Sequence, residues 1–367
     1  MESPLLLITT LFLALGVAAG WIMHRSDFCI ARAFRDLFLF GDGFQLRMQL
    51  VVVAAAMLLF ELGRLAGGFQ LPFPLFGPPS VTHLVGGCVF GIGMVLAGGC
   101  VVGTLYKAGA GSVPSAMAVL GIVLGSALYA EMHPTWSALA GRLSLATATT
   151  LPQWSGMAPT PLVAVGFGLC LLVFRRWRKK SDWRRSAFAE GYLQPWKAAL
   201  LIALIGGIAA VAVGMPLGIT TGYSKIAGWA GRWMAPEHFA GLVFFASDSL
   251  DYLHPLYPQP LRGGAGARLD AIAAIQWPLI GGIALGSAAS ALILGEWHLR
   301  WQIPRRQYLS VLCGGVLMGV AARLGAGCTI WHLWGGMAIF ALPSFLFVAG
   351  LFPGAWLGSR FLARYVI

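Results

Sequence analysis

Three cysteines in this sequence stand at the same distance after a glycine-bearing apolar segment. Gly86 lies fourteen residues before Cys100, and Gly314 lies fourteen before Cys328. The pair Leu15-Gly16 repeats this spacing, with Leu15 fourteen residues before Cys29. A fourth segment, with Gly206, precedes a threonine by the same distance. The residues at the four equivalent positions are Cys29, Cys100, Thr220 and Cys328. Because the position recurs, we interpret these side chains as one functional set.

Cysteine at such a position offers chemistry that serine or glycine lacks. Its sulfur is polarisable, its S–H group is a weak hydrogen-bond donor, and its thiolate is reactive. The pattern therefore fits a weak binding path for an anion as well as thiol–disulfide chemistry. No Cys-x-x-Cys or Cys-x-x-His pair and no nucleotide or haem motif accompanies it, so we predict no metal and no cofactor. The remaining cysteines are interpreted as packing residues: Cys88, Cys170 and Cys313.

Glycine and proline interrupt the apolar pattern around three of the four positions, in residues 98–103, 216–222 and 325–329. A broken backbone inside a bilayer is tolerated only where it lines a cavity or is buried in protein. The breaks also create helix N-termini, whose free N–H groups and positive dipole end attract anions. We therefore expect an anion pathway at the breaks, with Gly99 and Gly327 in it.

Two basic residues near the breaks are candidates for attracting an anion. Arg323 lies five residues before Cys328 in an apolar segment, where a charge is costly and therefore a candidate for function. Lys107 lies seven residues after Cys100. Each also has an ordinary interpretation. Arg323 could reach the carbonyls at a helix C-terminus, and Lys107 could belong to a solvated loop.

The elements that carry these residues must lie in a membrane. Of the 367 residues 58% are hydrophobic and only 10% are charged, whereas soluble domains carry about 25% charged residues. This composition excludes a soluble enzyme, a secreted disulfide scaffold and a disordered chain. The net charge of +12 is interpreted as membrane topology and not as a nucleic-acid interface, because multi-pass proteins collect Lys and Arg in cytoplasmic loops.

Nine segments have the length and apolar character of a spanning helix, which needs about 20 residues. Shorter pieces that break or re-enter are expected at 101–111, 218–247 and 325–335. The fold class that follows is an all-α, multi-pass membrane protein. The nine segments are 4–23, 45–67, 80–98, 113–131, 160–174, 197–213, 270–294, 308–324 and 337–360.

A run of basic residues at 175–180, directly after the fifth segment, predicts the orientation. Short loops this basic stay in the cytoplasm. The basic residues after the first segment, Arg25, Arg32, Arg35 and Arg47, then also lie inside. This arrangement predicts an N-terminus outside the cell and a cytoplasmic C-terminus.

Four spans on each side of the fifth divide the chain into two halves. Residues 1–131 form the first half, residues 132–196 hold an outer segment, the fifth span and the basic loop, and residues 197–367 form the second half. Because an odd number of crossings separates equivalent spans, they run in opposite directions. The prediction is an inverted 4+1+4 repeat about a pseudo-twofold axis in the membrane plane.

Three stretches of the sequence carry a resemblance to a known family: residues 26–36 (Ser-Asp-Phe-Cys-Ile-Ala-Arg-Ala-Phe-Arg-Asp), 98–100 (Gly-Gly-Cys) and 325–329 (Gly-Ala-Gly-Cys-Thr). Through them the sequence resembles the YeeE/YedE family of bacterial inner-membrane proteins, whose characterised members take up thiosulfate. The resemblance implies an hourglass-shaped helical protein in which three cysteines at the constriction pass thiosulfate by S–H hydrogen bonds. Carried over to this chain, these are Cys29, Cys100 and Cys328. The resemblance also implies a small cytoplasmic sulfur-carrier protein as partner, docking near 176–196.

We therefore expect a transporter, not an enzyme, that takes up thiosulfate or a related sulfur-containing anion across the bacterial inner membrane. Two alternatives stay open. The stretch around Cys29 is similar to that of relatives linked to selenium metabolism, which favours a selenium compound as substrate. The same cysteines could also serve a membrane thiol-redox enzyme that cycles between thiol and disulfide.

Overall fold

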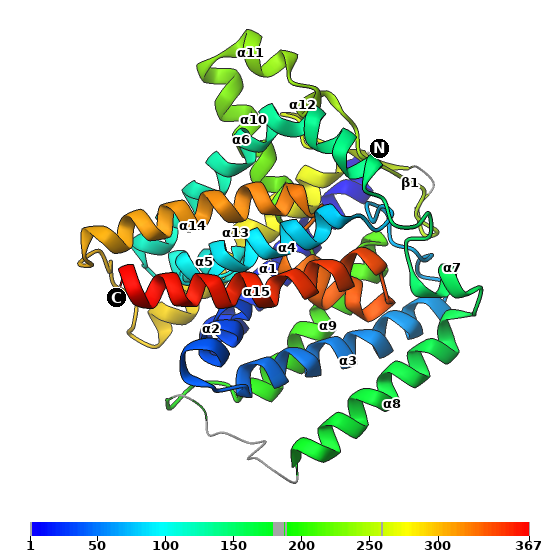
Figure 1. Ribbon diagram of the computed structural model, residues 1–367, viewed down its shortest axis with the longest axis horizontal. Helices are drawn as coiled ribbons and strands as arrows, with labels where there is room; N and C mark the ends of the chain where they lie inside the picture. The colour runs from blue at the N-terminus through cyan, green and yellow to red at the C-terminus, as the bar shows by residue number, and fades with distance from the viewer. Residues whose placement is uncertain (1, 179–186, 188, 258–259, 367) are drawn as a thin grey trace.

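The computed structural model of the protein describes residues 2–178, 187, 189–257 and 260–366. Long helices run side by side through the molecule and dominate these residues (Figure 1). They are α1 (Glu2–Ser26), α3 (Phe44–Leu65), α4 (Val81–Leu96), α6 (Val113–Arg142), α8 (Pro159–Arg178), α9 (Pro195–Val213), α13 (Ala271–Ile293), α14 (Arg305–Leu324) and α15 (Leu342–Tyr365).

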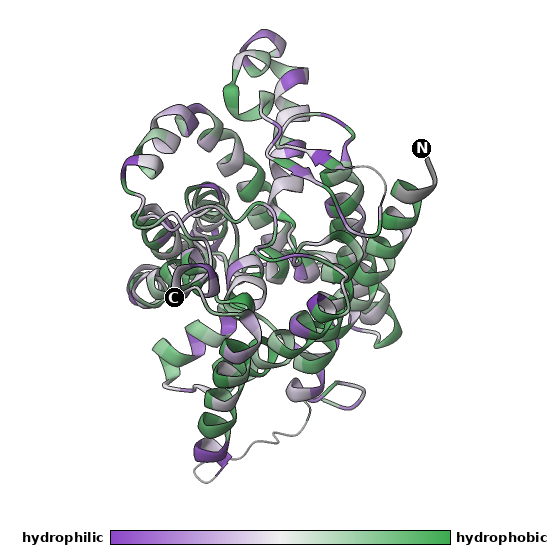
Figure 2. Ribbon diagram, turned by 90° about the vertical axis from the view of Figure 1, so that its right-hand side faces the viewer, coloured by the Kyte–Doolittle hydropathy of each residue, from purple (hydrophilic) through white to green (hydrophobic). Residues whose placement is uncertain are grey.

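The membrane character predicted from composition is confirmed. In the described part of the chain nine helices are long and apolar enough to cross a membrane, and Figure 2 shows hydrophobic residues along much of their length. Each of the nine predicted segments falls on one of them. The last span starts at Leu342 and not at residue 337, because other helical turns occupy residues 330–339 and Pro343 stands in the first turn of α15.

Short elements follow the long helices and connect them. The predicted short pieces at 101–111, 218–247 and 325–335 hold α5, then α10 to α12, and most of η1. The elements are α2 (Ile30–Phe40), α5 (Val101–Gly109), α7 (Leu151–Ser155), α10 (Thr220–Met234), α11 (Pro236–Gly241), α12 (Val243–Ala246), the antiparallel strands β1 (Leu250–Tyr252) and β2 (Leu261–Gly263), the π-helix η1 (Ile330–Gly336) and the 3-10 helix η2 (Met337–Ile339).

The helix α2 is not among the elements predicted from the sequence, which only places Arg32 and Arg35 on the inner side after the first span. In the structure Arg32 and Arg35 both pair with Asp36, at 3.1 and 2.8 Å. The opposite face buries apolar residues such as Ile30 and Phe34. Because the charges satisfy one another, the helix can lie against α3 and α15.

The long helices pair across the two halves of the sequence. Helix α1 packs on α13 and α3 on α9, while α4 packs on α15 and α6 on α14. In the centre α4 also contacts α14, and α1 contacts α9. Helix α8 lies at the edge of the molecule against α3 (Figure 1).

Glycines stand where these helices cross, which accounts for much of the high glycine content, 49 of 367 residues. A Cβ atom on Gly20 would lie 2.1 Å from the Ile283 carbonyl oxygen, and one on Gly87 would lie 2.0 Å from that of Phe347. A side chain at either position would force the helices apart. Small residues are favoured at helix contacts in membranes because they let backbones approach closely.

We expect Gly87→Ala to destabilise the protein by about 1–3 kcal/mol, because the added methyl group overpacks the contact of α4 with α15. The measurement is the melting temperature of the purified protein in detergent. Gly281→Ala on α13 is the matched control, because no atom lies within 4 Å of its added Cβ. If both variants melt alike, the close crossing of α4 and α15 does not contribute to stability.

Candidate functional site

The four equivalent positions all lie at the start of a short helix. Cys29 and Cys100 are the N-cap residues of α2 and α5, and Thr220 is the first residue of α10. Cys328 lies two residues before the π-helix η1. The three cysteines are completely buried, with exposed fractions of 0, 0 and 1%. The predicted helix breaks therefore exist, and each presents its side chain inside the protein.

Cys29 and Cys100 lie side by side. Their thiol groups lie close to each other, and both remain free thiols. Gly103 covers the pair from α5, and a Cβ atom on this glycine would lie 2.6 Å from the Cys29 sulfur and 3.4 Å from that of Cys100. The third cysteine, Cys328, is close enough to Cys100 for an electrostatic interaction.

Each sulfur lies near a backbone N–H group three residues further along the chain. The Cys100 sulfur accepts a hydrogen bond from the Gly103 amide at 3.4 Å. The sulfur atoms of Cys29 and Cys328 lie near the amides of Arg32 and Trp331. This is the place of an N-cap oxygen, but sulfur is a weaker acceptor. The amides at the helix N-termini therefore stay electropositive.

A hydrogen-bonded network joins the first two breaks. Tyr106 on α5 donates to the Asp27 carboxylate at 2.9 Å, and the same carboxylate pairs with Arg32 on α2. The Lys107 ammonium group donates to the Gly98 carbonyl at 2.8 Å and so satisfies a peptide group freed by the break before Cys100. The two cysteine-bearing helices are therefore held in one position relative to each other.

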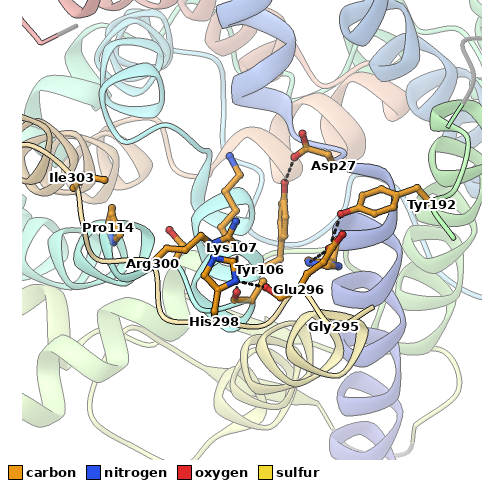
Figure 3. A pocket seen from close by; sticks show the side chains of 13 residues that line it. Asp27, Tyr106, Lys107, Pro114, Tyr192, Gly295, Glu296, His298, Arg300 and Ile303 are labelled. Carbon is orange, nitrogen blue, oxygen red and sulfur yellow. Dashed lines mark hydrogen bonds and ion pairs between the residues drawn. The ribbon is translucent and has the colours of Figure 1, made fainter. Parts of the chain in front are cut away.

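A cavity of about 740 Å³ opens beside this network, and we name it the Lys107 cavity. Figure 3 shows Asp27 and Tyr106 joined by their hydrogen bond, with Tyr192 and Glu296 next to them. Tyr192 donates to Glu296 at 2.8 Å. Burial and this hydrogen bond raise the pKa of Tyr192 to about 12, so the hydroxyl stays protonated. The lining also contains His24, His298 and Arg300.

A second cavity of about 260 Å³ is lined by Arg323 at the C-terminal end of α14, and we name it the Arg323 cavity. The guanidinium group donates to the Thr220 hydroxyl and, at 3.3 Å, to that of Thr221. In the described part of the chain no carboxylate forms an ion pair with Arg323. Gly327 and Trp331, which flank Cys328 in sequence, lie in the same wall.

The two cavities lie at opposite ends of the same helices. Ile303, just before α14, lines the Lys107 cavity, and Arg323 lies near the other end of that helix. The 20 residues of α14 extend about 30 Å, which is the thickness of the hydrocarbon core. None of the three cysteines lines either cavity. They belong instead to the buried core between the two.

The structure thus separates the predicted site residues into two groups. Lys107 lies with Cys29 and Cys100, whereas Thr220, Arg323 and Gly327 lie with Cys328. Gly99 is buried in its break, where a Cβ would lie 3.0 Å from the Thr104 amide. Gly327 has even less room, since a Cβ would lie 2.4 Å from the Trp331 ring. Both glycines are therefore required by the tight turns that present the cysteines.

Several residues of the site are not predicted from the sequence. Asp27 and Tyr106 are far apart along the chain, and only the fold brings them together. Gly103 had a visible signal, because it lies one helical turn after Cys100 and on the same face. Tyr223 on α10, whose ring is buried, interacts with Cys328 but has no distinguishing pattern. Among the described residues no group of His, Cys, Asp or Glu is placed to hold a metal ion.

Among the described residues, nine helices long enough to span a membrane, broken elements between them, and cavities at both ends of a buried core define a multi-pass membrane transporter. A family model described as sulphur transport matches residues 25–357, and the chain belongs to that family. It is 29% identical to the thiosulfate transporter TsuA of Spirochaeta thermophila, over 95% of this chain and 98% of that protein. It is 26% identical to the thiosulfate transporter TsuA of Escherichia coli, over 93% of this chain and 92% of the relative.

We expect Gly103→Ala to separate the Cys29 and Cys100 thiols, because the methyl group takes the place of the Cys29 sulfur. Disulfide formation between them under mild oxidation should slow roughly tenfold, the effect of about 1.4 kcal/mol on a barrier. Mass spectrometry of the cysteine peptides measures it. Gly168→Ala on α8 is the control, since no atom lies within 4 Å of its Cβ. Equal rates for Gly103→Ala and the parent would contradict the placement of the two thiols.

Proposed function

We propose that this protein takes up thiosulfate or a related sulfur-containing anion, and that Cys29, Cys100 and Cys328 pass it through the membrane. The observation that carries the proposal is the position of these buried cysteines between two cavities at opposite ends of the spanning helices. The two relatives named thiosulfate transporter support the choice of substrate.

The proposed path starts in the Arg323 cavity, where the guanidinium group, which forms no ion pair with a described carboxylate, attracts the anion. The anion then passes Cys328, followed by the Cys100 and Cys29 pair, and leaves through the Lys107 cavity. Neutral thiols suit this passage because they donate weakly. Conduction requires binding that is favourable enough for the ion to enter and loose enough for it to leave. A strong fixed charge at the constriction would hold a dianion too tightly.

The orientation that we propose places the Arg323 cavity on the outer side of the bacterial inner membrane, with the N-terminus outside and the C-terminus in the cytoplasm. The basic run at 175–180 supports it, although its residues 179 and 180 lie outside the described part of the chain. Arg25, Lys107 and Arg300 then lie on the inner side, as the preference for cytoplasmic Lys and Arg requires.

We further propose that residues 1–131 and 197–367 are inverted halves around the intervening residues 132–196. The helix pairings support this arrangement. Equivalent helices of the two halves are α1 and α9, α3 and α13, α4 and α14, and α6 and α15. If each helix is replaced by its equivalent, the observed pair α1 and α13 becomes α9 and α3, which is also an observed pair. The same exchange turns the pairing of α4 with α15 into that of α14 with α6.

A small cytoplasmic sulfur-carrier protein is the partner that we propose for the inner side, where it would receive the anion as it leaves. Its proposed docking segment is 176–196. Residues 179–186 and 188 of this segment lie outside the described residues. Tyr192 and Gly191, in the part that is described, lie beside the Lys107 cavity, with Gly191 accepting a hydrogen bond from Arg25 at 2.7 Å.

Replacing Cys100 or Cys328 by Ala should lower uptake of labelled thiosulfate into proteoliposomes about tenfold, because each change removes a donor at a step without alternatives. Cys88→Ala and Cys313→Ala are the controls, since Cys88 is half-buried and Cys313 is exposed on the outside of the molecule. Normal uptake by both Cys100→Ala and Cys328→Ala would disprove the relay. Adding selenium-containing anions as competitors in the same assay tests the alternative substrate class.

The proximity of Cys29 and Cys100 favours a second candidate function, thiol–disulfide exchange. In that case two thiols would lose two protons and two electrons to an acceptor during turnover. Our expectation is that both cysteines stay reduced while thiosulfate is transported, as measured by the intact mass of the protein after rapid alkylation. A lasting loss of two hydrogen atoms that depends on Cys29 would favour the redox enzyme and overturn the relay.

A further inference from the structure

Hydrogen-bond donors without a partner gather around Cys328. Nine buried side-chain nitrogen and oxygen atoms of the described residues have no hydrogen-bond partner within the protein. Four of the nine belong to residues near this single cysteine: Arg323 Nε, Tyr223 Oη, Thr329 Oγ1 and Trp331 Nε1. Such a concentration is unusual because buried polar groups are normally satisfied.

The four residues approach Cys328 from α10, from α14 and from the segment that follows the cysteine in the chain. Thr329 follows it in the chain, and the Trp331 backbone amide lies near its sulfur. Arg323 and Tyr223 come from α14 and α10, and both lie within electrostatic range of the cysteine. Arg323 and Trp331 also line the Arg323 cavity. The unpartnered donors therefore lie around Cys328, behind the wall of this cavity that Arg323 and Trp331 form.

All four unpartnered groups can donate a hydrogen bond. The indole N–H and the guanidinium N–H can only donate, and the two hydroxyl groups can donate as well. Tyr223 and Thr329 are each 1% exposed and Trp331 is 6% exposed. The described residues that line the cavity include no Asp or Glu. What this place requires is therefore a ligand with several hydrogen-bond acceptors.

The electrostatics point to a negative charge on that ligand. Arg323 lies at the N-terminus of α10, which has 15 residues and no hydrogen bond from an N-cap side chain. A guanidinium group and the positive end of a helix thus face the same cavity. The Gly222 amide is already bonded to Gln276 at 2.6 Å, so the attraction rests mainly on Arg323 and the unpartnered donors.

We propose that Arg323, Tyr223, Thr329 and Trp331 form an oxyanion site that holds the oxygen end of the substrate while its terminal sulfur faces Cys328. This inference rests on the proposed function and narrows its substrate class. The protein would select anions that combine a hard oxygen end with a soft chalcogen end. Sulfate has the oxygen end but no terminal sulfur, so it should bind at the site without moving on to the cysteines. Thiocyanate has a soft sulfur but no oxygen end, so it should bind poorly.

Binding of thiosulfate to the purified protein in detergent tests the site by calorimetry. Tyr223→Phe and Thr329→Val each remove one donor while keeping the shape, and each should weaken binding about two- to tenfold. Arg323→Gln should weaken it about ten- to a hundredfold, because a charged donor is lost. Tyr252→Phe is the matched control. Its hydroxyl is also buried without a partner, but it lies on β1 away from the cavity.

Sulfate and thiocyanate then test the two ends separately. Sulfate should compete with thiosulfate in the parent protein, and its affinity should be the same in Cys328→Ala. This variant should lose only the preference for thiosulfate over sulfate. Thiocyanate should not compete. Unchanged thiosulfate and sulfate affinity in Tyr223→Phe, Thr329→Val and Arg323→Gln would overturn the site, even if uptake is normal. Sulfate binding that depends on Arg323 in a protein without thiosulfate uptake would instead uphold the site and reject the proposed function.

Discussion

The structure depends on a constraint that lipid imposes on interrupted helices. A break inside the bilayer frees peptide groups that cost several kcal/mol each unless they find partners within the protein. Here side chains of the following short helices supply them, as Lys107 does for the Gly98 carbonyl. His332 in η1 lies 2.8 Å from the Gly325 carbonyl and 2.9 Å from the Ser344 hydroxyl. Because a carbonyl only accepts, Nε2 carries the proton and Nδ1 accepts from Ser344. The break and its partner therefore form one unit that holds the cysteine.

Glycine makes these units compatible with close packing. At Gly87 the backbone of α15 occupies the space of a side chain, and at Gly103 the two thiols lie where a side chain would begin. Glycine thus allows two helices to cross closely at Gly87 and leaves room for the cysteine sulfurs at Gly103. Since neighbouring atoms leave so little room, the positions of the cysteine sulfurs are determined by the helix packing around them.

Charge is distributed differently at the two ends of the buried core. The Arg323 cavity has a cation that forms no ion pair with a carboxylate of the described residues, whereas the Lys107 cavity contains Asp27 and Glu296 beside its basic groups. Asp27 is paired with Arg32, and Glu296 accepts from Tyr192. The carboxylates offset part of the positive charge of Lys107 and Arg300 in the second cavity, whereas no carboxylate among the described lining residues offsets that of Arg323 in the first. For an anion that moves from the Arg323 cavity to the Lys107 cavity, this difference favours binding at the start and release at the end.

The sequence by itself determined the membrane class, the nine spans and the family, because hydropathy and short motifs are local properties. It also identified the cysteine positions, since each follows a glycine-bearing segment at a constant spacing. It did not predict α2, whose charges pair only once the helix forms, or the contacts of Asp27 with Tyr106 and of Arg323 with Thr220. Those residues lie far apart in the chain. Only the tertiary structure decided which breaks meet, because side chains from different helices become neighbours through packing and not through spacing.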